Sequence, residues 1–359
     1  MERTEQESEC VDESEEKQIP IINGLPDDIS LSCLARVPRC YHTRLKCVSR
    51  RWRDLLCSEE WYDHRKKGNL AESWIYALCR DTSARVYLYA LNPNSSKRSW
   101  RRIHEHPPHL CMREGMGFAA MGKRLYVLDG CGWSEDASHN AYCYDVAKNT
   151  WDQIPHLSTK RCYFTCETLD GKMYAIGGVG LEPSIPQTWD VYEDSTKAWE
   201  SFSDTNIVPG IDDSFVMDGR IYVHGGGYSK TSNVQAAVYE PSTGTWKQVD
   251  DEMASGFRGP AVVVGDDLYV LDQSFGTTLT MWCKETRKWV RLGRLATRQP
   301  CRLVAVGNRV FVIGRDCYTV VVDVEVARKT AVGLMVCSSI PKAPTDDIFV
   351  VIGCRSVAI

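Results

Sequence analysis

The stretch GKMYAIGG, residues 171–178, is one of five copies of a short pattern that recurs along this chain. Each copy runs from charged or small residues through an apolar segment with a central aromatic residue, and most copies end at or next to glycine. The others are KRLYVLDG (123–130), GRIYVHGG (219–226), DDLYVLDQ (266–273) and NRVFVIGR (308–315). Their aromatic residues lie 48, 48, 47 and 42 positions apart. A repeat of this period indicates an array of one structural unit.

Two further features keep the same register. Tryptophan recurs at intervals of 51, 48, 47 and 43 residues, at Trp100, Trp151, Trp199, Trp246 and Trp289. In four units another aromatic residue precedes this tryptophan by seven positions: Tyr144, Tyr192, Tyr239 and Trp282. Because large aromatic residues dominate protein cores, we expect these side chains to pack within and between the units.

The apolar runs within each unit are short, as in residues 268–271, and are bounded by glycine or polar turns. This pattern predicts short antiparallel strands, about four per unit. One such sheet cannot bury both of its faces, so the units must stack radially. The sequence therefore predicts a mainly β fold, a six-bladed β-propeller over residues 70–359. The first unit begins at residues 74–78 without an opening strand, and we expect residues 348–352 to supply it. Counts of five or seven blades stay open.

These residues resemble the kelch repeat, in which a strand ends in a glycine doublet and is followed by a tyrosine and then a tryptophan. Doublets stand at Gly177-Gly178 and Gly225-Gly226, where the backbone must turn tightly. The fifth and sixth units depart from the pattern, because Asp272-Gln273 and Gly314-Arg315 replace the doublet. The sixth unit also has no tryptophan, and Thr330 stands near its expected place.

Residues 19–67 follow a different, helical pattern. Pro26, Asp27 and Asp28 suit the first turn of a helix. After Pro38, a second helix is predicted, with an apolar stripe at Leu45, Val48, Trp52 and Leu55. About fifty residues make only a small core, so this segment is expected to gain stability from a partner or from docking.

The string LPDDISLSCLARVPRCYHTRLKCVSRRWRDLLCSEEWY, residues 25–62, resembles the F-box. An F-box followed by kelch units resembles the F-box/kelch-repeat proteins, which are numerous in plants. The resemblance implies that the segment docks onto a Skp-type adaptor and, through it, a cullin-based ubiquitin ligase. It assigns the adaptor face or its support to Leu25, Pro26, Ile29, Leu34, Val48 and Trp52, with Trp52 expected in the core. The alternative is a helical cap packed on the propeller.

Composition narrows the remaining choices. The 359 residues leave no length for a separate catalytic domain. Residues 1–18 hold eight acids against Arg3 and Lys17, a net charge of −6, and we expect this tail to be disordered. The rest of the chain carries a net charge of only +2, which argues against nucleic-acid binding, because that function needs a concentrated basic surface. No stretch suits a signal peptide or a membrane span, so cytoplasmic or nuclear placement and reduced thiols for the sixteen cysteines are expected.

The sequence shows no evident metal-binding or catalytic motif. The cluster His104, His106, His109 and Cys111 has no standard zinc spacing, and no Cys-x-x-Cys pair occurs. Some kelch propellers are copper oxidases, but His139, His156 and His224 do not form an evident ligand set. We therefore predict a non-catalytic protein with no metal and no cofactor.

Arginines begin several of the units and form the candidate substrate site. Arg113, Arg161 and Arg298 precede their unit's central aromatic residue by 13 positions, and Arg258 does so by 11. Equivalent positions should converge at one end of the channel, where guanidinium groups could bind an acidic or phosphorylated segment. The alternative is that these arginines hold inter-blade turns by bonding carbonyls or nearby acids. Trp133 and Tyr228, in long loops, are the candidate aromatic contacts.

The combined prediction is a substrate receptor of a ubiquitin ligase. The helical segment would bind the adaptor, and the propeller would bind an unidentified target protein. The alternative is a kelch scaffold or ligand sensor that takes no part in ubiquitination.

Overall fold

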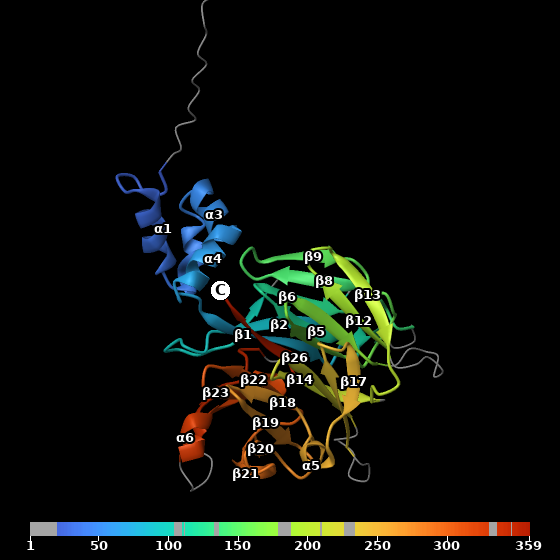
Figure 1. Cartoon of the computed structure of the whole chain (residues 1–359). Helices are drawn as coiled ribbons and strands as arrows, with labels where there is room; N and C mark the ends of the chain where they lie inside the picture. Colours follow the sequence, from blue (N-terminus) through green and yellow to red (C-terminus); the bar gives the residue numbers. More distant parts are fainter. Residues whose placement is uncertain are drawn as a thin grey trace, which may run out of the picture. The chain divides into compact units, whose positions relative to one another are not determined.

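The computed structural model describes residues 20–103, 110, 112–132, 136–178, 188–208, 210–225, 234–329, 336–345 and 347–359. The acidic tail, the loop with His104, His106, His109 and Cys111, and Thr330 lie outside these described residues. The chain divides into two compact units, Met1–Ala71 and Glu72–Ile359. We call them the helical unit and the propeller (Figure 1).

The helical unit consists of short helices around a small core. They are α1 (Asp27–Ala35), the 3-10 helix η1 (Arg39–Tyr41), α2 (His42–Leu45), α3 (Arg50–Cys57) and α4 (Glu59–Lys67). As predicted, α1 follows Pro26 directly and carries Asp27 and Asp28 in its first turn, where acids favour the helix dipole. Leu34, Leu56 and Trp61 form the centre of the core.

The prediction of one continuous helix after Pro38 is wrong. The chain forms α2 and α3 with a turn between them, because Ser49 adopts an extended conformation and begins a new helix. The Ser49 hydroxyl accepts a hydrogen bond of 3.1 Å from the Trp52 amide, as a preferred N-cap residue does. Leu45 and Trp52 still pack against the core, but Val48 lies in the turn and is exposed.

Six four-stranded sheets build the described part of the propeller. Blade 1 contains β26 (Phe349–Ala358), β1 (Ser73–Asp81), β2 (Val86–Leu91) and β3 (Arg101–Ile103). Blade 2 contains β5 (Gly117–Met121), β6 (Arg124–Leu128), β8 (Ala141–Asp145) and β9 (Thr150–Ile154). Blade 3 contains β10 (Thr165–Leu169), β11 (Lys172–Ile176), β12 (Thr188–Glu193) and β13 (Ala198–Ser203).

Blade 4 contains β14 (Ile211–Met217), β15 (Arg220–Gly225), β16 (Gln235–Glu240) and β17 (Thr245–Gln248). Blade 5 contains β18 (Ala261–Val264), β19 (Asp267–Asp272), β20 (Thr278–Cys283) and β21 (Lys288–Arg294). Blade 6 contains β22 (Arg302–Val306), β23 (Arg309–Ile313), β24 (Thr319–Asp323) and β25 (Val336–Ile340). The short elements α5 (Asp251–Ala254), α6 (Val324–Lys329) and η3 (Arg315–Cys317) lie between strands, and β4 (Arg113–Glu114) pairs with β7 (Cys131–Gly132).

Blade 1 joins the two ends of the propeller chain. Strand β26, the last in sequence, pairs antiparallel with β1, and Tyr76 lies opposite Arg355. The prediction that the C-terminal segment supplies the missing strand is confirmed, although β26 extends beyond residues 348–352. Figure 1 shows β26, β5, β14, β18 and β22 grouped at the middle of the propeller and β9, β13, β17 and β21 at its periphery. Each blade therefore presents its first strand to the central channel.

The seven-residue spacing between aromatic residues is the register of a hairpin. Tyr144 lies directly opposite Trp151 on β8 and β9, with ring centroids 5.1 Å apart. The same cross-strand pair recurs in the next three blades, with centroids 5.0, 5.3 and 5.3 Å apart: Tyr192–Trp199, Tyr239–Trp246 and Trp282–Trp289. Such aromatic pairs stabilise neighbouring strands, so the sequence period reports the outer hairpin of each blade.

The glycine doublet of blade 3 has the conformation that its position predicts. Gly177 and Gly178 have φ values of 69° and 94°, which favour glycine. A Cβ atom on Gly178 would approach the Cys162 carbonyl oxygen to 2.7 Å. The doublet therefore lets the chain turn against the neighbouring loop.

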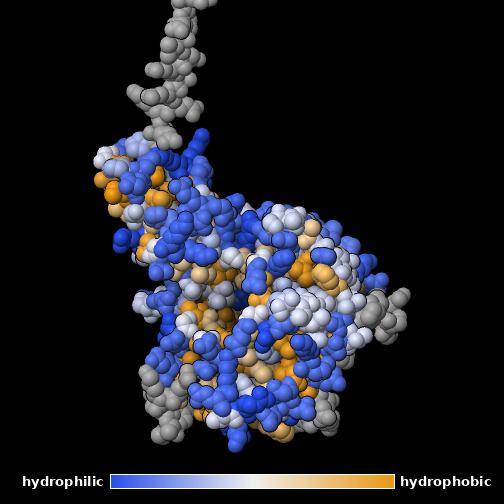
Figure 2. Space-filling view, in the orientation of Figure 1, coloured by the Kyte–Doolittle hydropathy of each residue, from blue (hydrophilic) through white to orange (hydrophobic). Residues whose placement is uncertain are grey.

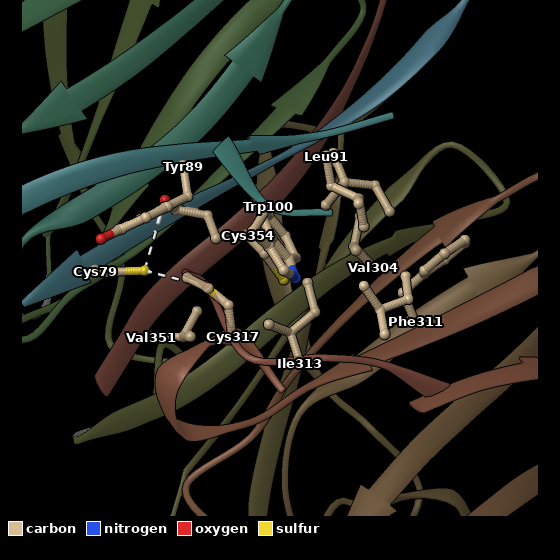
Figure 3. Close-up of a cluster of buried hydrophobic side chains, with 14 of the residues drawn as sticks. Cys79, Tyr89, Leu91, Trp100, Val304, Phe311, Ile313, Cys317, Val351 and Cys354 are labelled. Carbon is tan, nitrogen blue, oxygen red and sulfur yellow. Dashed lines mark hydrogen bonds between the residues drawn. The ribbon is translucent and has the colours of Figure 1, made fainter. Parts of the chain in front are cut away.

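The core between blades 1 and 6 closes the ring (Figure 3). Side chains from both blades meet there, including Tyr89 and Leu91 from β2 and Phe311 and Ile313 from β23. Trp100 is buried in the same cluster, and its indole N–H donates to the Thr319 hydroxyl over 3.1 Å. Contacts of this kind fix the last blade to the first.

Candidate partner-binding surfaces

An apolar stripe lies along the outer side of α1. Leu25 and Ile29 are 40% and 47% exposed, and Cys33, one further turn along, is also exposed. A spacing of four residues places Ile29 and Cys33 on one face of α1, and Leu25 lies two residues before the helix, whereas Ser30 and Leu34 face the core. Figure 2 shows hydrophobic residues gathered at the surface near α1. Pro26 is exposed at the start of the stripe.

Two polar contacts hold the start of α3, one against the first residue of α1 and one against the segment that leads into it. Arg51 Nη2 lies 2.5 Å from Asp27 Oδ2, and the Trp52 indole N–H donates to the Ile21 carbonyl over 2.7 Å. These contacts bring the turn that carries Val48 toward the beginning of α1. Val48 is 61% exposed, so it adds a further apolar side chain at this end of the unit.

The six predicted adaptor-face residues thus separate into two groups. Leu25, Pro26, Ile29 and Val48 are at the surface. Leu34 is only 5% exposed and Trp52 is half-buried, and both pack in the core of the helical unit. Tyr41, which is 47% exposed, is a further exposed aromatic side chain of the helical unit and is not among these six residues.

A buried arginine fixes the end of α1 from inside the unit. Arg65 of α4 is fully buried and donates from Nη1 to the Ala35 carbonyl over 2.5 Å and from Nη2 to the Leu70 carbonyl over 2.7 Å.

Burial, with the nearby Arg65 charge, lowers the pKa of His42 to about 4. The His42 ring packs edge-on against Trp61, with centroids 5.6 Å apart, so it acts as a neutral core residue.

The four candidate arginines of the propeller all precede inner strands. Arg113, Arg161, Arg258 and Arg298 come three or four residues before β5, β10, β18 and β22, respectively. Their backbones therefore lie at one end of the channel, which we call the channel mouth. Each side chain contacts a different group of the propeller itself.

Arg161 points into its own blade and not into the channel mouth. Its side chain is 2% exposed, and Nη2 lies 3.0 Å from Oδ1 of the buried Asp190. Its Nη1 donates to the Gly177 carbonyl over 2.7 Å and to the Thr188 carbonyl over 3.1 Å. This burial corrects the expectation that Arg161 contacts a substrate, because groups inside the blade already bind its guanidinium group. The alternative of a turn-holding arginine describes this residue.

The other three arginines differ in exposure. Arg113 is half-buried, with Nε 3.5 Å from Oδ1 of the buried Asp129. Arg258 donates from Nε to the Ser255 carbonyl over 3.2 Å. Arg298 is 67% exposed, and its Nη1 lies 3.8 Å from Asp316 Oδ2. Among the predicted set, Arg298 is therefore the most accessible guanidinium. Trp133 and Tyr228 lie outside the described residues.

The channel mouth contains a cavity of about 700 Å³. Residues at the beginning of β5, β10, β14, β18 and β22, together with part of β26, line it. Two of its walls are charged: Asp212 and Asp213 come from blade 4, and Arg302 and Arg355 come from blades 6 and 1. The volume lies in the range of ligand-binding clefts.

A polar network crosses the channel at this cavity, where Thr165, Ser214 and Arg355 are lining residues. Arg355 Nη2 lies 3.4 Å from Glu167 Oε1 and donates to the Cys166 carbonyl over 2.8 Å. The Ser214 hydroxyl donates to Glu167 Oε1 over 2.8 Å and also contacts the Thr165 hydroxyl. Burial raises the pKa of Glu167 to about 6, although the Arg355 charge acts in the opposite direction.

Sequence reasoning missed Glu167, Arg302 and Arg355. A signal was available, because each is a charged residue within an otherwise largely apolar inner strand: TCETL, RLVAV and FVVIGCRSVA. Asp212 and Asp213 lie in the fourth unit, for which the arginine series has no member. Recognising all five requires knowing which strand of each blade faces the channel.

The three histidines weighed as copper ligands do not converge on one point. His139 and His156 have ring centroids 4.6 Å apart, whereas His224 is fully buried against Phe257. The described residues hold no group of three or more His, Cys, Asp or Glu side chains arranged for a metal ion. Within the same residues, every helix is too short or too polar to cross a membrane.

Comparison with known proteins agrees with this two-part organisation. Residues 22–64 match the F-box domain family, and residues 75–302 match the family described as FKB95, Kelch-repeats domain. F-box/kelch-repeat protein SKIP4 of Arabidopsis thaliana is 63% identical over 353 residues, covering 97% of each chain. Another F-box/kelch-repeat protein of Arabidopsis thaliana is 29% identical, covering 72% of this chain and 67% of that protein. The chain belongs to the F-box/kelch-repeat family.

Proposed function

We propose that this protein is the substrate-recognition subunit of a Skp-cullin-F-box ubiquitin ligase. The helical unit binds a Skp-type adaptor and, through it, a cullin, while the propeller binds the target protein. The observation that carries the proposal is the exposed apolar stripe within the F-box match, which Ile29 and Cys33 form on α1 and Leu25 forms just before it. We assign residues 19–67 to adaptor binding and residues 70–359 to target binding, in the cytoplasm or the nucleus.

The adaptor face combines the stripe with the neighbouring turn. Leu25, Pro26, Ile29 and Val48 contact the adaptor directly, and Tyr41 extends the face. Burying such side chains contributes about 25 cal/mol for each Å² of apolar surface removed from water. Leu34 and Trp52 support the face from the core, since they are packed beneath it.

The target-binding face is the channel mouth. Arg298 offers an exposed guanidinium group, and Arg113 and Arg258 are half-buried beside the inner strands. Guanidinium groups bind carboxylate and phosphate through paired hydrogen bonds. Arg161 supports this face indirectly, because its contacts with Gly177 and Thr188 hold the turn of blade 3. Trp133 and Tyr228 are proposed as aromatic contacts from the sequence alone.

The protein contributes proximity and no covalent chemistry in this proposal. F-box/kelch-repeat proteins generally act as substrate adaptors and not as catalysts. Binding the target and the ligase at the same time raises the effective concentration of target lysines near the conjugating enzyme. Recognition at two separate units is sufficient for this role.

Co-purification of the full chain with a purified Skp-type adaptor tests the proposal. The wild-type chain should capture the adaptor in a 1:1 complex on size exclusion. The double variant Leu25→Ala/Pro26→Ala should lose this complex while its thermal unfolding midpoint stays unchanged. Val290→Ala is the matched control, because Val290 is a 40% exposed apolar residue on β21 of the propeller. Equal capture by wild type and double variant, or no capture by wild type, would contradict the adaptor role.

A scaffold or ligand sensor is the alternative, and the cavity in the channel mouth is the feature that favours it. The two functions differ in the fate of the bound partner. A receptor's target should accumulate in cells that carry Leu25→Ala/Pro26→Ala, whereas a scaffold's partner should keep its abundance.

A further inference from the structure

We infer that the channel mouth recognises a target segment that carries a basic and an acidic side chain close together. This inference rests on the proposed function and specifies its target class. The carboxylates and the guanidinium groups of the mouth lie on different walls of one cavity: Asp212 and Asp213 on blade 4, and Arg302 and Arg355 on blades 6 and 1. A segment with only acidic side chains would meet repulsion from blade 4.

A β-bulge directs the two carboxylates to the cavity. Ile211 pairs with Gly225 and Asp213 pairs with His224, so Asp212 is an extra residue in β14. Consecutive side chains of a regular strand point to opposite faces, but a bulge changes the direction of one of them. Asp212 and Asp213 both line the cavity as a result. Asp213 Oδ2 also accepts the Ala261 amide over 2.8 Å, which fixes its position between blades 4 and 5.

A second bulge shapes the positive wall. On β26, Val351 pairs with Cys79 and Gly353 pairs with Leu78, which leaves Ile352 as the extra residue. The Ile352 carbonyl accepts a hydrogen bond of 2.8 Å from Arg302 Nε. This bond uses only one donor of the guanidinium group. The terminal nitrogens of Arg302 make no hydrogen bond to any residue that the structure describes and are oriented by the Nε contact.

The charged side chains of the cavity therefore select between target segments as well as attract them. Asp212, Asp213 and Arg302 are all half-buried, where charge interactions are stronger than in bulk water. A basic group bound to the carboxylates and an acidic group bound to Arg302 satisfy both walls together. The cavity of about 700 Å³ has room for a few side chains of an extended segment.

Panning random heptapeptides displayed on phage against the immobilised full chain tests the inference. The variants are Asp212→Asn/Asp213→Asn, which keeps an oxygen acceptor for the Ala261 amide, and Arg302→Gln. Matched controls are Asp218→Asn in the β14–β15 turn and Arg220→Gln at the start of β15. Asp218 pairs with Lys284 and Arg220 pairs with Glu240, both outside the cavity. Peptides enriched on the wild type should carry Lys or Arg within four positions of Asp or Glu.

The variants then separate the two contacts. The double variant should lose enrichment of basic residues, Arg302→Gln should lose enrichment of acidic residues, and each should bind the best peptide at least tenfold more weakly than the controls do. Enrichment of acidic residues alone, no enrichment, or a variant that binds the best peptide as tightly as its control does would overturn the inference. Adaptor capture by the full chain depends on the helical unit, and these variants lie in the propeller, so that result stands or fails independently of this one.

Discussion

Arg355 on β26 of blade 1 lies 3.4 Å from Glu167 on β10 of blade 3, measured between Nη2 and Oε1. Strands β26 and β10 both contact β5 of blade 2, so this ion pair connects two blades that are not neighbours. Arg355 Nη2 also donates to the Cys166 carbonyl over 2.8 Å. The C-terminal strand therefore closes the ring twice, through its pairing with β1 and through a side chain that crosses the channel.

Replacing Arg355 with methionine should lower the free energy of unfolding by about 3 kcal/mol, because it leaves Glu167 half-buried without its positive partner. Equilibrium denaturation of the full chain in urea measures this change. Arg220→Met is the matched control, since Arg220 pairs with Glu240 at a more exposed position. We expect the control to change the free energy of unfolding by less than about 0.5 kcal/mol. Equal effects of the two substitutions would contradict the cross-channel role.

Alanine substitution should lower the stability of the protein at Arg161 but not at Arg298. Arg161→Ala leaves Asp190 buried without its ion-pair partner and should lower the free energy of unfolding by about 3 to 5 kcal/mol. Arg298→Ala removes a 67% exposed side chain and should leave stability within about 0.5 kcal/mol. Thermal unfolding of both variants distinguishes these roles. Loss of target binding by Arg298→Ala at unchanged stability would mark it as a contact residue, and full binding would remove it from the target face.

How far the sequence predicts this molecule depends on whether a feature repeats. The aromatic pair Tyr144–Trp151 has counterparts in the next three blades, so its period is visible and six blades could be predicted. Asp212 lines the cavity through a bulge that occurs in one blade, and no repeat announces it. Arg161 has the spacing of a rim residue, but the direction of its side chain depends on Asp190, which the spacing does not include. In the helical unit, the spacing of Leu45, Val48 and Trp52 predicts one continuous helix. The Ser49 hydroxyl caps the start of a new helix within this segment, and the spacing of apolar residues does not show that break.

His224 should make the propeller less stable in mild acid. Its ring is fully buried, neither nitrogen has a hydrogen-bond partner among the residues that the structure describes, and burial lowers its pKa. In the unfolded chain a histidine binds a proton below about pH 6.5, whereas His224 in the folded chain stays neutral. The unfolded state therefore binds more protons as the pH falls below 6.5, and the free energy of unfolding decreases.

His224→Leu removes this proton linkage and the unpaired nitrogens. The variant should be more stable than the wild type by about 1 kcal/mol at pH 7.5, and the difference should grow by about 1 kcal/mol at pH 5.5. Urea denaturation at the two pH values measures both changes. His156→Leu, at an exposed position, should change stability by less than about 0.5 kcal/mol. A difference that stays constant between the two pH values would show that His224 takes up its proton in the folded state.

Ile29 and Leu34 occupy opposite sides of α1 and should separate adaptor binding from folding. Ile29→Ala removes a 47% exposed side chain, so adaptor affinity should fall at least tenfold while the unfolding midpoint is unchanged. Leu34→Ala creates a cavity beside Leu56 and Trp61 and should lower the free energy of unfolding of the helical unit by about 2 to 4 kcal/mol. Calorimetric titration of the adaptor and hydrogen exchange of residues 27–67 in the full chain measure the two effects. If Ile29→Ala weakens folding as Leu34→Ala does, the stripe is part of the core; if it changes neither quantity, the adaptor binds elsewhere on the helical unit.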